Sequence, residues 1–426
     1  MHDLKTHSTT LPEQDVLFLG DAQYVYHCHH FNLFHDQTIE DALGEERAFE
    51  VRAHAAAEAT RPLLESLARE QGAETPAERL QLAARLFPWM GHGKLEIQSD
   101  GGGGHALGEY LHYSFAWREK YGDKIRRRHP IDAFAAGWAA AATEVAHGLP
   151  AGHLVGRETA CFARRDPGCR FELTPTNGSG NGASPAGGPT IDRSRVEQRV
   201  GPAGAGREED TIRRIARGLK DYLIAVEGDE RGLVQGFGLY ITRHLSSYYN
   251  ATAYDTLHHI ERTAPESARV VEDLLGESGH VCAFYTCGNI LLSPEWEALV
   301  GPVRGEVEEI VASCVAIARA LGFGHWTIEE LIPDERLVLR ATSNYEAPYY
   351  LARYGQSEVA RSYFFANAAR AFMQLAHRVD WRQRPQLDEA LYQSLFKGTD
   401  DLGWKVEQST CLTRGDAYCE AVVTRA

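Results

Sequence analysis

The residues best suited to chemistry are two pairs of cysteines, one pair in each half of the chain of 426 residues. Seven residues separate Cys161 from Cys169, and seven separate Cys411 from Cys419. The sequence Asp166-Pro167-Gly168 predicts a turn that brings Cys169 back toward Cys161. Two thiolates on one hairpin can bind the same metal ion, each at about 2.3 Å from a zinc. A cross-hairpin disulfide and two buried, inert thiols are the alternatives that the spacing leaves open.

A second candidate is a histidine-rich segment near the start of the chain. Four histidines and one cysteine lie within residues 27–35, which is dense for a chain with 19 histidines. His27 and His29 share a face if the segment is a strand, and His27 and His30 share one if it is a helix. Either pair could ligate a metal ion or supply acid and base groups near neutral pH. Together with His112, these histidines are the candidate catalytic residues.

Charge and composition restrict the kind of protein that carries these residues. The chain has 44 Lys and Arg against 59 Asp and Glu, a formal net charge of −15, which argues against a nucleic-acid binder. The basic run from Lys124 to Arg128 is expected to be a solvated turn. No secretory signal and no apolar stretch of about 18 residues is seen. Eight cysteines are too few for a disulfide scaffold, so we expect a protein of the reducing cytoplasm. The charge and the lack of a long apolar stretch predict neither a nucleic-acid nor a membrane partner, and a homodimer is left open.

One linker and one internal repeat organise the chain. Residues 174–208 contain eight Gly and four Pro, which predicts a flexible linker between domains at 1–173 and 209–426. Besides the cysteine pairs, residues 91–97 (GHGKLEI) parallel 322–328 (GFGHWTI), and residues 112–122 (HYSFAWREKYG) parallel 343–355 (SNYEAPYYLARYG). This order predicts two divergent copies of one domain, the second with an insertion around residues 379–400.

The histidine segment differs between the two copies. Residues 240–249, which correspond to it, keep a single histidine. One functional and one scaffolding copy would show this asymmetry, although drift explains it equally well.

Hydrophobic periodicity predicts similar elements in both copies. Thr75-Pro76-Ala77-Glu78 has the pattern of a capping box and predicts a helix through Phe87, and Ser293-Pro294 opens another. Further helices are predicted at 133–147, 303–321 and 357–377, and strands at 326–328 and 336–341. The stretch around His112 is predicted as a strand, and each cysteine pair as part of a final hairpin. The fold class is therefore α+β, as two tandem copies of a helices–hairpin–helix–hairpin domain.

Three segments of the first copy resemble the 4-vinyl reductase domain, namely residues 134–138 (FAAGW), 156–161 (GRETAC) and 166–171 (DPGCRF). This domain occurs in bacteriochlorophyll 4-vinyl reductases and in the sensory part of phenol- and toluene-responsive activators. The second copy resembles it more weakly, through residues 343–346 (SNYE) and the hairpin at 411–419. The resemblance covers residues 90–173 and 320–424. It implies a fold like that of the transport-protein-particle subunits, with an apolar small-molecule pocket between helices and sheet.

The resemblance also implies a structural zinc, which the sensory relatives hold with Cys, Glu, Cys and Cys. Glu158, Cys161 and Cys169 match the last three ligands, whereas Asp132-Ala133-Phe134-Ala135 stands where the first is expected. Either a nearby histidine (His129, His147 or His153) completes a closed site, or a water completes an open one. The second copy keeps Cys411 and Cys419, but Gln408 replaces the glutamate. The expectation of a zinc ion is therefore stronger for the first copy than for the second.

A ligand site is implied in the same way. In the phenol-sensing relatives, an aromatic residue just before an Asn-Ser-Tyr-Glu-like motif helps to bind the phenol. His112 occupies that position in the first copy, and Thr342 occupies it in the second. The candidate ligand-binding residues are His112, Tyr113 and Trp117, and a polar ring in an apolar pocket would suit a hydroxyl or a carboxylate. A solvent-facing histidine is the alternative.

The favoured hypothesis is that the protein binds a small apolar or aromatic molecule as a carrier, a sensor or an accessory factor, with a structural zinc at the first cysteine hairpin. The alternative is a metal-dependent enzyme of specialised or tetrapyrrole-type metabolism that uses the histidines of residues 27–35. Gly101–Gly104 precede no helix that could cradle a phosphate, so no nucleotide cofactor is expected.

Overall fold

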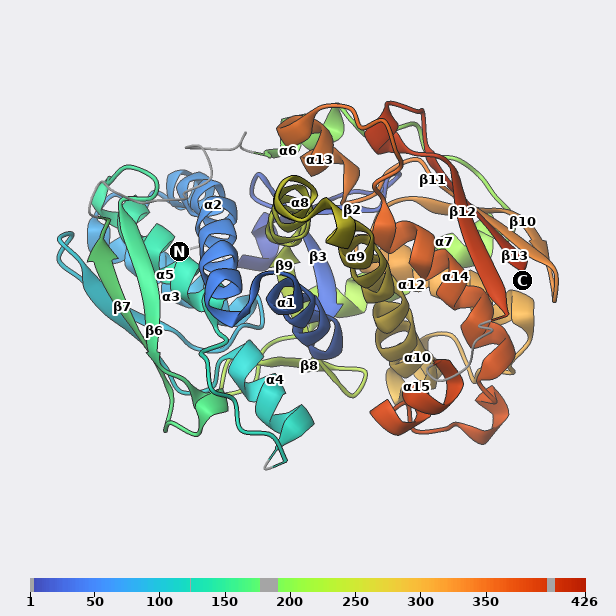
Figure 1. Ribbon diagram of the computed structural model, residues 1–426, viewed down its shortest axis with the longest axis horizontal. Helices are drawn as coiled ribbons and strands as arrows, with labels where there is room; N and C mark the ends of the chain where they lie inside the picture. Colours follow the sequence, from blue (N-terminus) through green and yellow to red (C-terminus); the bar gives the residue numbers. More distant parts are fainter. Residues whose placement is uncertain (1–3, 123, 177–190, 397–402) are drawn as a thin grey trace.

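Three antiparallel sheets packed with helices form the protein, which confirms the α+β class. The structure is a computed structural model that describes residues 4–122, 124–176, 191–396 and 403–426. One four-stranded sheet lies toward each end of the molecule, and a five-stranded sheet lies between them (Figure 1).

Strands from both halves of the chain build the central sheet. Its order is β1 (Ser8–Leu11), β2 (Val16–Leu19), β3 (Ala22–Cys28), β9 (Leu239–Leu245) and β8 (Val234–Gly236). In the antiparallel pair of β3 and β9, Tyr26 lies opposite Arg243. All residues of β3 are buried, and one hydrophobic cluster continues from the first half into the second. The two halves are therefore joined through a common core, not only through the chain that links them.

The two outer sheets have the same topology. The first has the order β4 (Glu96–Ser99), β5 (Gly104–Gly108), β7 (Cys169–Pro175), β6 (Leu154–Ala160), and the second has β10 (Trp326–Ile332), β11 (Arg336–Ala341), β13 (Cys419–Arg425), β12 (Trp404–Thr410). In both, the register shifts three residues before the first hairpin cysteine, between Glu158 and Ala160 and between Gln408 and Thr410. The predicted strands at 326–328 and 336–341 and both cysteine hairpins are confirmed.

Five helices pack around the first outer sheet and the central sheet: α1 (His29–Leu43), α2 (Glu45–Gln71), α3 (Pro76–Trp89), α4 (His112–Tyr121) and α5 (Ala133–His147). The predicted capping box at Thr75 starts α3 as expected. Close packing of α5 depends on small residues, because a Cβ at Gly137 would lie 2.0 Å from the carbonyl oxygen of Ala53 in α2. A Cβ at Gly156 in β6 would lie 2.3 Å from the carbonyl oxygen of Ala136. These glycines let α5 lie against both α2 and β6.

The second half is richer in helices. They are α7 (Glu209–Ala225), α8 (Ser246–Thr263), α9 (Ala268–Cys282), α10 (Gly288–Leu292), α11 (Pro294–Leu299), α12 (Val307–Ala320), α13 (Ala347–Tyr354), α14 (Tyr363–Arg378) and α15 (Glu389–Phe396). A π-helical segment, η4 (Ala283–Cys287), continues α9, and short 3-10 turns occur at Leu4–His7 (η1), Phe162–Arg164 (η2), Pro265–Ser267 (η3), Trp381–Gln383 (η5) and Leu412–Arg414 (η6). The η5 turn and α15 fall within the predicted insertion. Among the described residues, no helix combines the length and the apolar character needed to cross a membrane.

One local prediction was wrong. The stretch that begins at His112 is helix α4, not a strand, because its apolar residues are buried on several sides and do not alternate. Within the predicted linker, residues 177–190 lie outside the described residues, but residues 191–208 include α6 (Arg193–Glu197). This part is attached to the sheets, since the amide of Gly201 donates to the carbonyl of Thr342 at 2.8 Å and Arg207 forms a β-bridge with Ile328. Residues 191–208 therefore contain regular structure, while the flexible linker over 174–208 stays a prediction.

Candidate functional site

Four buried side chains meet at the base of the β6–β7 hairpin: Asp132, Glu158, Cys161 and Cys169. Each offers one ligand atom, and these atoms all lie within 4.8 Å of one another. Asp132 immediately precedes α5, Glu158 lies in β6, and the cysteines flank the turn between β6 and β7. The group therefore connects a helix to both strands of the hairpin.

Local hydrogen bonds point these side chains inward. The amide of Cys161 donates to Oδ2 of Asp166 at 2.8 Å, which closes the turn, and the amide of Phe162 donates to Sγ of Cys169 at 3.3 Å. The amide of Asp132 donates to Oε2 of Glu158 at 2.9 Å, while Oε1 of Glu158 has no hydrogen-bond partner among the described residues. The turn and the register shift together orient two sulfurs and two carboxylates toward one point.

Electrostatics at this point favour a cation. Burial, with the nearby Cys161, raises the pKa of Glu158 well above its ordinary value, and burial raises the pKa values of Asp132 and Cys169. Burial opposes ionisation of Cys161 as well, but the hydrogen bond from Cys169 lowers its pKa. A divalent cation would compensate these buried acidic groups, and two thiolates with two carboxylate oxygens form a four-ligand set that suits zinc. Four protein ligands around one ion would form a closed site.

Asp132 supplies the fourth ligand atom of the group, for which the sequence left a nearby histidine or a water as alternatives. His129 is exposed and lies 3.2 Å from Glu45, and neither His147 nor His153 belongs to the group. One feature of the sequence indicated Asp132: it stands at the start of the predicted helix, where the domain that the chain resembles has a cysteine. A carboxylate there is an equally good ligand for a hard or borderline metal ion.

The second half repeats the hairpin without the carboxylates. Sγ of Cys411 and Sγ of Cys419 lie 3.7 Å apart, but Ser362 precedes the helix where Asp132 does, and Gln408 stands in the place of Glu158. Within the described residues, only the first-half group brings three or more His, Cys, Asp or Glu ligands together. The hydrogen bond from Cys419 lowers the pKa of Cys411 to about 5.

A cluster of buried histidines and aromatic rings adjoins the group of Asp132, Glu158, Cys161 and Cys169. His92 lies at its centre, and its ring centroid is 4.4 Å from that of Phe134, 4.8 Å from that of His244 and 6.1 Å from that of His112. Burial lowers the pKa of His92 well below its ordinary value, so the ring is neutral. Among the described residues, neither ring nitrogen of His92 has a hydrogen-bond partner. The cluster thus contains an unpaired donor and an unpaired acceptor among aromatic rings.

His112 and His244 of the cluster are each hydrogen-bonded through Nε2, while Nδ1 of His244 has no partner among the described residues. Nε2 of His112 lies 2.9 Å from Nδ2 of Asn32, and Nε2 of His244 lies 3.0 Å from the hydroxyl of Tyr113. Of the three predicted ligand-binding residues, His112 and Tyr113 therefore reach this cluster. Trp117 instead packs on Tyr121 and under the guanidinium of Arg127, at 4.3 and 4.7 Å. The expected alternative of a solvent-facing His112 is wrong, since only 2% of this residue is exposed.

The structure distributes the histidines of residues 27–35 over two elements. Because β3 ends at Cys28 and α1 begins at His29, neither the strand pairing nor the helix pairing applies to the whole segment. His27 stacks on Phe31 at 3.6 Å, whereas His30 stacks on Tyr285 at 4.0 Å. Nδ1 of His29 accepts a hydrogen bond from the amide of Tyr240 at 3.3 Å. These three histidines stay predictions as catalytic residues.

Sequence reasoning missed His92 and His244 as site residues. His92 stands between two glycines with positive φ, and a Cβ at Gly93 would lie 2.1 Å from the carbonyl oxygen of Tyr110. The turn thereby fixes the place of the His92 ring, and this Gly-His-Gly pattern is the signal that was available. His244 reaches the cluster only through the pairing of β3 with β9, which no local pattern shows.

No protein-family model and no curated protein matches the chain. Among solved structures, the chain is similar to the phenol-responsive sensory domain of the transcription activator PoxR with phenol, at 18% sequence identity and a TM-score of 0.33. The match covers 40% of this chain and 86% of that chain.

Proposed function

We propose that the protein binds a small hydroxylated aromatic molecule in the first half of the chain, beside a structural zinc held by Asp132, Glu158, Cys161 and Cys169. The observation that carries the proposal is His92, which is 1% exposed and has no partner for either ring nitrogen among the described residues. An unsatisfied buried polar atom costs about 1–3 kcal/mol, and a ligand that pairs with it removes that cost. A hydroxyl would pair with the neutral imidazole, and the rings around it would contact the aromatic body.

The metal group supports the same region. The amide of Ser114 in α4 donates to Oδ1 of Asp132 at 3.2 Å, and its hydroxyl lies 3.4 Å from Sγ of Cys169. His112 lies in α4 and Phe134 lies in α5, and these two helices border the histidine cluster. The metal ligands therefore hold both helices in place. Zinc, when bound, would supply rigidity here and no catalytic step. The role is that of a carrier, a sensor or an accessory factor.

In this proposal, the first half binds the ligand and the second half serves as a scaffold. Their outer sheets share one topology, and His27 and His244 each occupy the penultimate position of paired strands, which supports two divergent copies of one domain. The second half has Phe323 between two glycines where the first has His92, and the ring of Phe323 lies 4.9 Å from that of His27. With neither the imidazole nor the two carboxylates, the second half would act as a scaffold.

Calorimetric titration of the metal-loaded full chain with phenol tests the proposal. We expect saturable binding of one phenol per chain, much weaker binding of toluene and cyclohexanol, and loss of binding in His92→Phe. Phe323→Leu is the matched control in the second half and should bind phenol as the wild type does. Absence of saturable phenol binding, or equal binding by His92→Phe, would overturn the proposal.

A further inference from the structure

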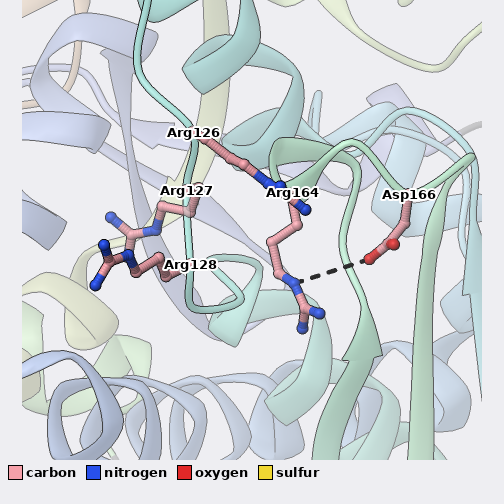
Figure 2. Close-up of a pocket in the computed structure, with 5 residues that line it drawn as sticks. All are labelled: Arg126, Arg127, Arg128, Arg164 and Asp166. Atoms are coloured by element: carbon pink, nitrogen blue, oxygen red, sulfur yellow. Dashed lines mark ion pairs between the residues drawn. The ribbon is translucent and has the colours of Figure 1, made fainter.

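Four arginines surround a hollow on the surface of the first half. Arg126, Arg127 and Arg128 come from the loop between α4 and α5, and Arg164 comes from the η2 turn of the cysteine hairpin. Figure 2 shows these side chains together with Asp166, the one acidic residue of the lining. The hollow has a volume of about 510 Å³, which is within the range of small-molecule sites.

One arginine of the group belongs to the interior. Arg127 is 5% exposed, forms an ion pair with Glu40, and donates from Nε to the carbonyl oxygen of His129 at 3.1 Å. The sequence-based expectation of a solvated turn is therefore wrong at Arg127. Its buried ion pair anchors the backbone of the loop and so fixes where the arginines on either side emerge.

The charge of the remaining arginines is only partly compensated. Arg126 and Arg128 are exposed, and neither forms a hydrogen bond or an ion pair with the described residues. Arg164 lies 3.9 Å from Asp166, at the limit of an ion pair, and Asp166 also accepts the amide of Cys161. At least two positive charges thus face one hollow in a chain whose net charge is −15. Like charges gathered without counterions are costly, and an anion removes that cost.

We propose that this hollow is a binding site for a small molecule that carries two or more phosphate groups. Guanidinium groups present planar pairs of N–H donors that match phosphate oxygens, and several of them around one concave surface suit a multiply charged anion. Since the walls are the loop that leads to Asp132 and the turn that follows Cys161, the anion would hold together the two segments that meet at the cysteine hairpin. The site does not depend on the proposed aromatic ligand.

The second half contains a natural control for this site. Its hairpin keeps the equivalent turn, in which Arg414 lies 3.8 Å from Asp416. The loop before α14 has Gln356, Ser357 and Glu358 in place of an arginine run. A turn arginine is therefore present in both halves, but within the part of the chain that the structure describes the uncompensated arginine cluster occurs in the first half alone.

Equilibrium titration of the full chain with inorganic pyrophosphate, at about 150 mM salt to screen weak surface attraction, tests the site. We expect saturation below about 1 mM, binding at least tenfold weaker in the double variant Arg126→Gln/Arg128→Gln, and unchanged binding in Arg414→Gln. Both substituted arginines are exposed, and circular dichroism will show that the double variant is folded. Wild-type affinity in the double variant, or loss of binding in Arg414→Gln, would overturn the proposal.

Two further ligands check the chemical class. Citrate carries several carboxylates, and we expect it to bind more weakly than pyrophosphate. A short DNA duplex presents phosphates along a rigid rod that a hollow of this size does not enclose, so it should compete poorly. Tighter binding of citrate or of the duplex than of pyrophosphate would contradict the assignment to a small phosphate compound.

Discussion

Oδ2 of Asp132 lies 3.2 Å from Sγ of Cys169, although the two residues are 37 positions apart in the chain. This contact places a carboxylate at the start of α5 beside a hairpin thiol, with both groups buried. A thiol at this distance donates a hydrogen bond to the carboxylate when no metal is bound, and both groups can ligate the same ion when one is present. The metal proposal therefore depends on Asp132 as much as on the cysteines.

We expect Asp132→Ser, which copies Ser362 of the second half, to release the metal. Loss of a direct ligand should weaken affinity by more than about tenfold, since even outer-shell substitutions cost about 10- to 100-fold. Elemental analysis after dialysis should fall from one equivalent of zinc per chain to well below one. The melting temperature should fall with it, because metal binding is coupled to folding.

Two variants control this experiment. Asp132→Cys replaces one ligand by another and should retain zinc, whereas Cys411→Ser removes a thiol from the second-half hairpin and should leave the zinc content unchanged. Full zinc retention by Asp132→Ser would exclude Asp132 as a ligand.

A buried carboxyl in the second half should make stability depend on pH. Burial raises the pKa of Glu346 to about 8, although its carboxylate accepts the amides of Phe364 and Phe365 at 3.1 and 3.3 Å. Between the ordinary pKa of a glutamate and about 8, the folded chain binds the proton that the unfolded chain has lost. Stability from this group is thus complete at low pH and is lost as pH rises toward 8, by up to about 1.4 kcal/mol per unit.

Glu346→Gln tests this because the amide is neutral at every pH. Urea unfolding of metal-free wild type and variant should give similar stabilities at pH 5 and a variant more stable by a few kcal/mol at pH 8. Parallel pH profiles for the two proteins would show that Glu346 does not hold its proton in the folded state.

The first half also contains a buried network of charged side chains, and loss of one member should strongly lower the free energy of unfolding. Arg52 of α2 is fully buried, and its guanidinium contacts Asp36 and lies 2.7 Å from Oε1 of Glu40 in α1. Arg52→Met leaves one carboxylate unpaired in the interior, which costs about 3–5 kcal/mol. In urea unfolding, Arg269→Met, which removes an exposed ion-paired arginine of α9, should change stability by less than about 1 kcal/mol.

Local sequence patterns predicted the parts of the fold that local interactions determine. The capping box at Thr75, the strands from Trp326 and Arg336, and the hairpin at Cys161 all depend on neighbours in sequence, and all are present. The helix at His112 was missed because its buried faces are set by tertiary packing, which conceals the usual periodicity.

The candidate site was predicted in part for the same reason. Glu158, Cys161 and Cys169 lie on one hairpin, so their spacing pointed to one ion. Asp132 comes from a helix that only the folded chain brings to that hairpin. His92 and His244 are 152 residues apart and meet through the central sheet, so spacing alone did not associate them.

His92 should lower the stability of the unliganded protein. Its imidazole is buried without a hydrogen-bond partner among the described residues, and such an unsatisfied group costs about 1–3 kcal/mol. Phenylalanine should fit the place, because Phe323 occupies the equivalent turn in the second half. We therefore expect unliganded His92→Phe to be more stable than wild type by about 1–3 kcal/mol in urea unfolding.

Phenol should reverse this order. It stabilises wild type in proportion to its occupancy and leaves His92→Phe unchanged, so the two unfolding curves should approach each other as phenol is added. Phe323→His is the reciprocal control and should destabilise the chain, because it introduces a second unpaired imidazole next to His27. If unliganded His92→Phe is instead less stable than wild type, the His92 imidazole is already satisfied in the native protein and does not indicate a ligand.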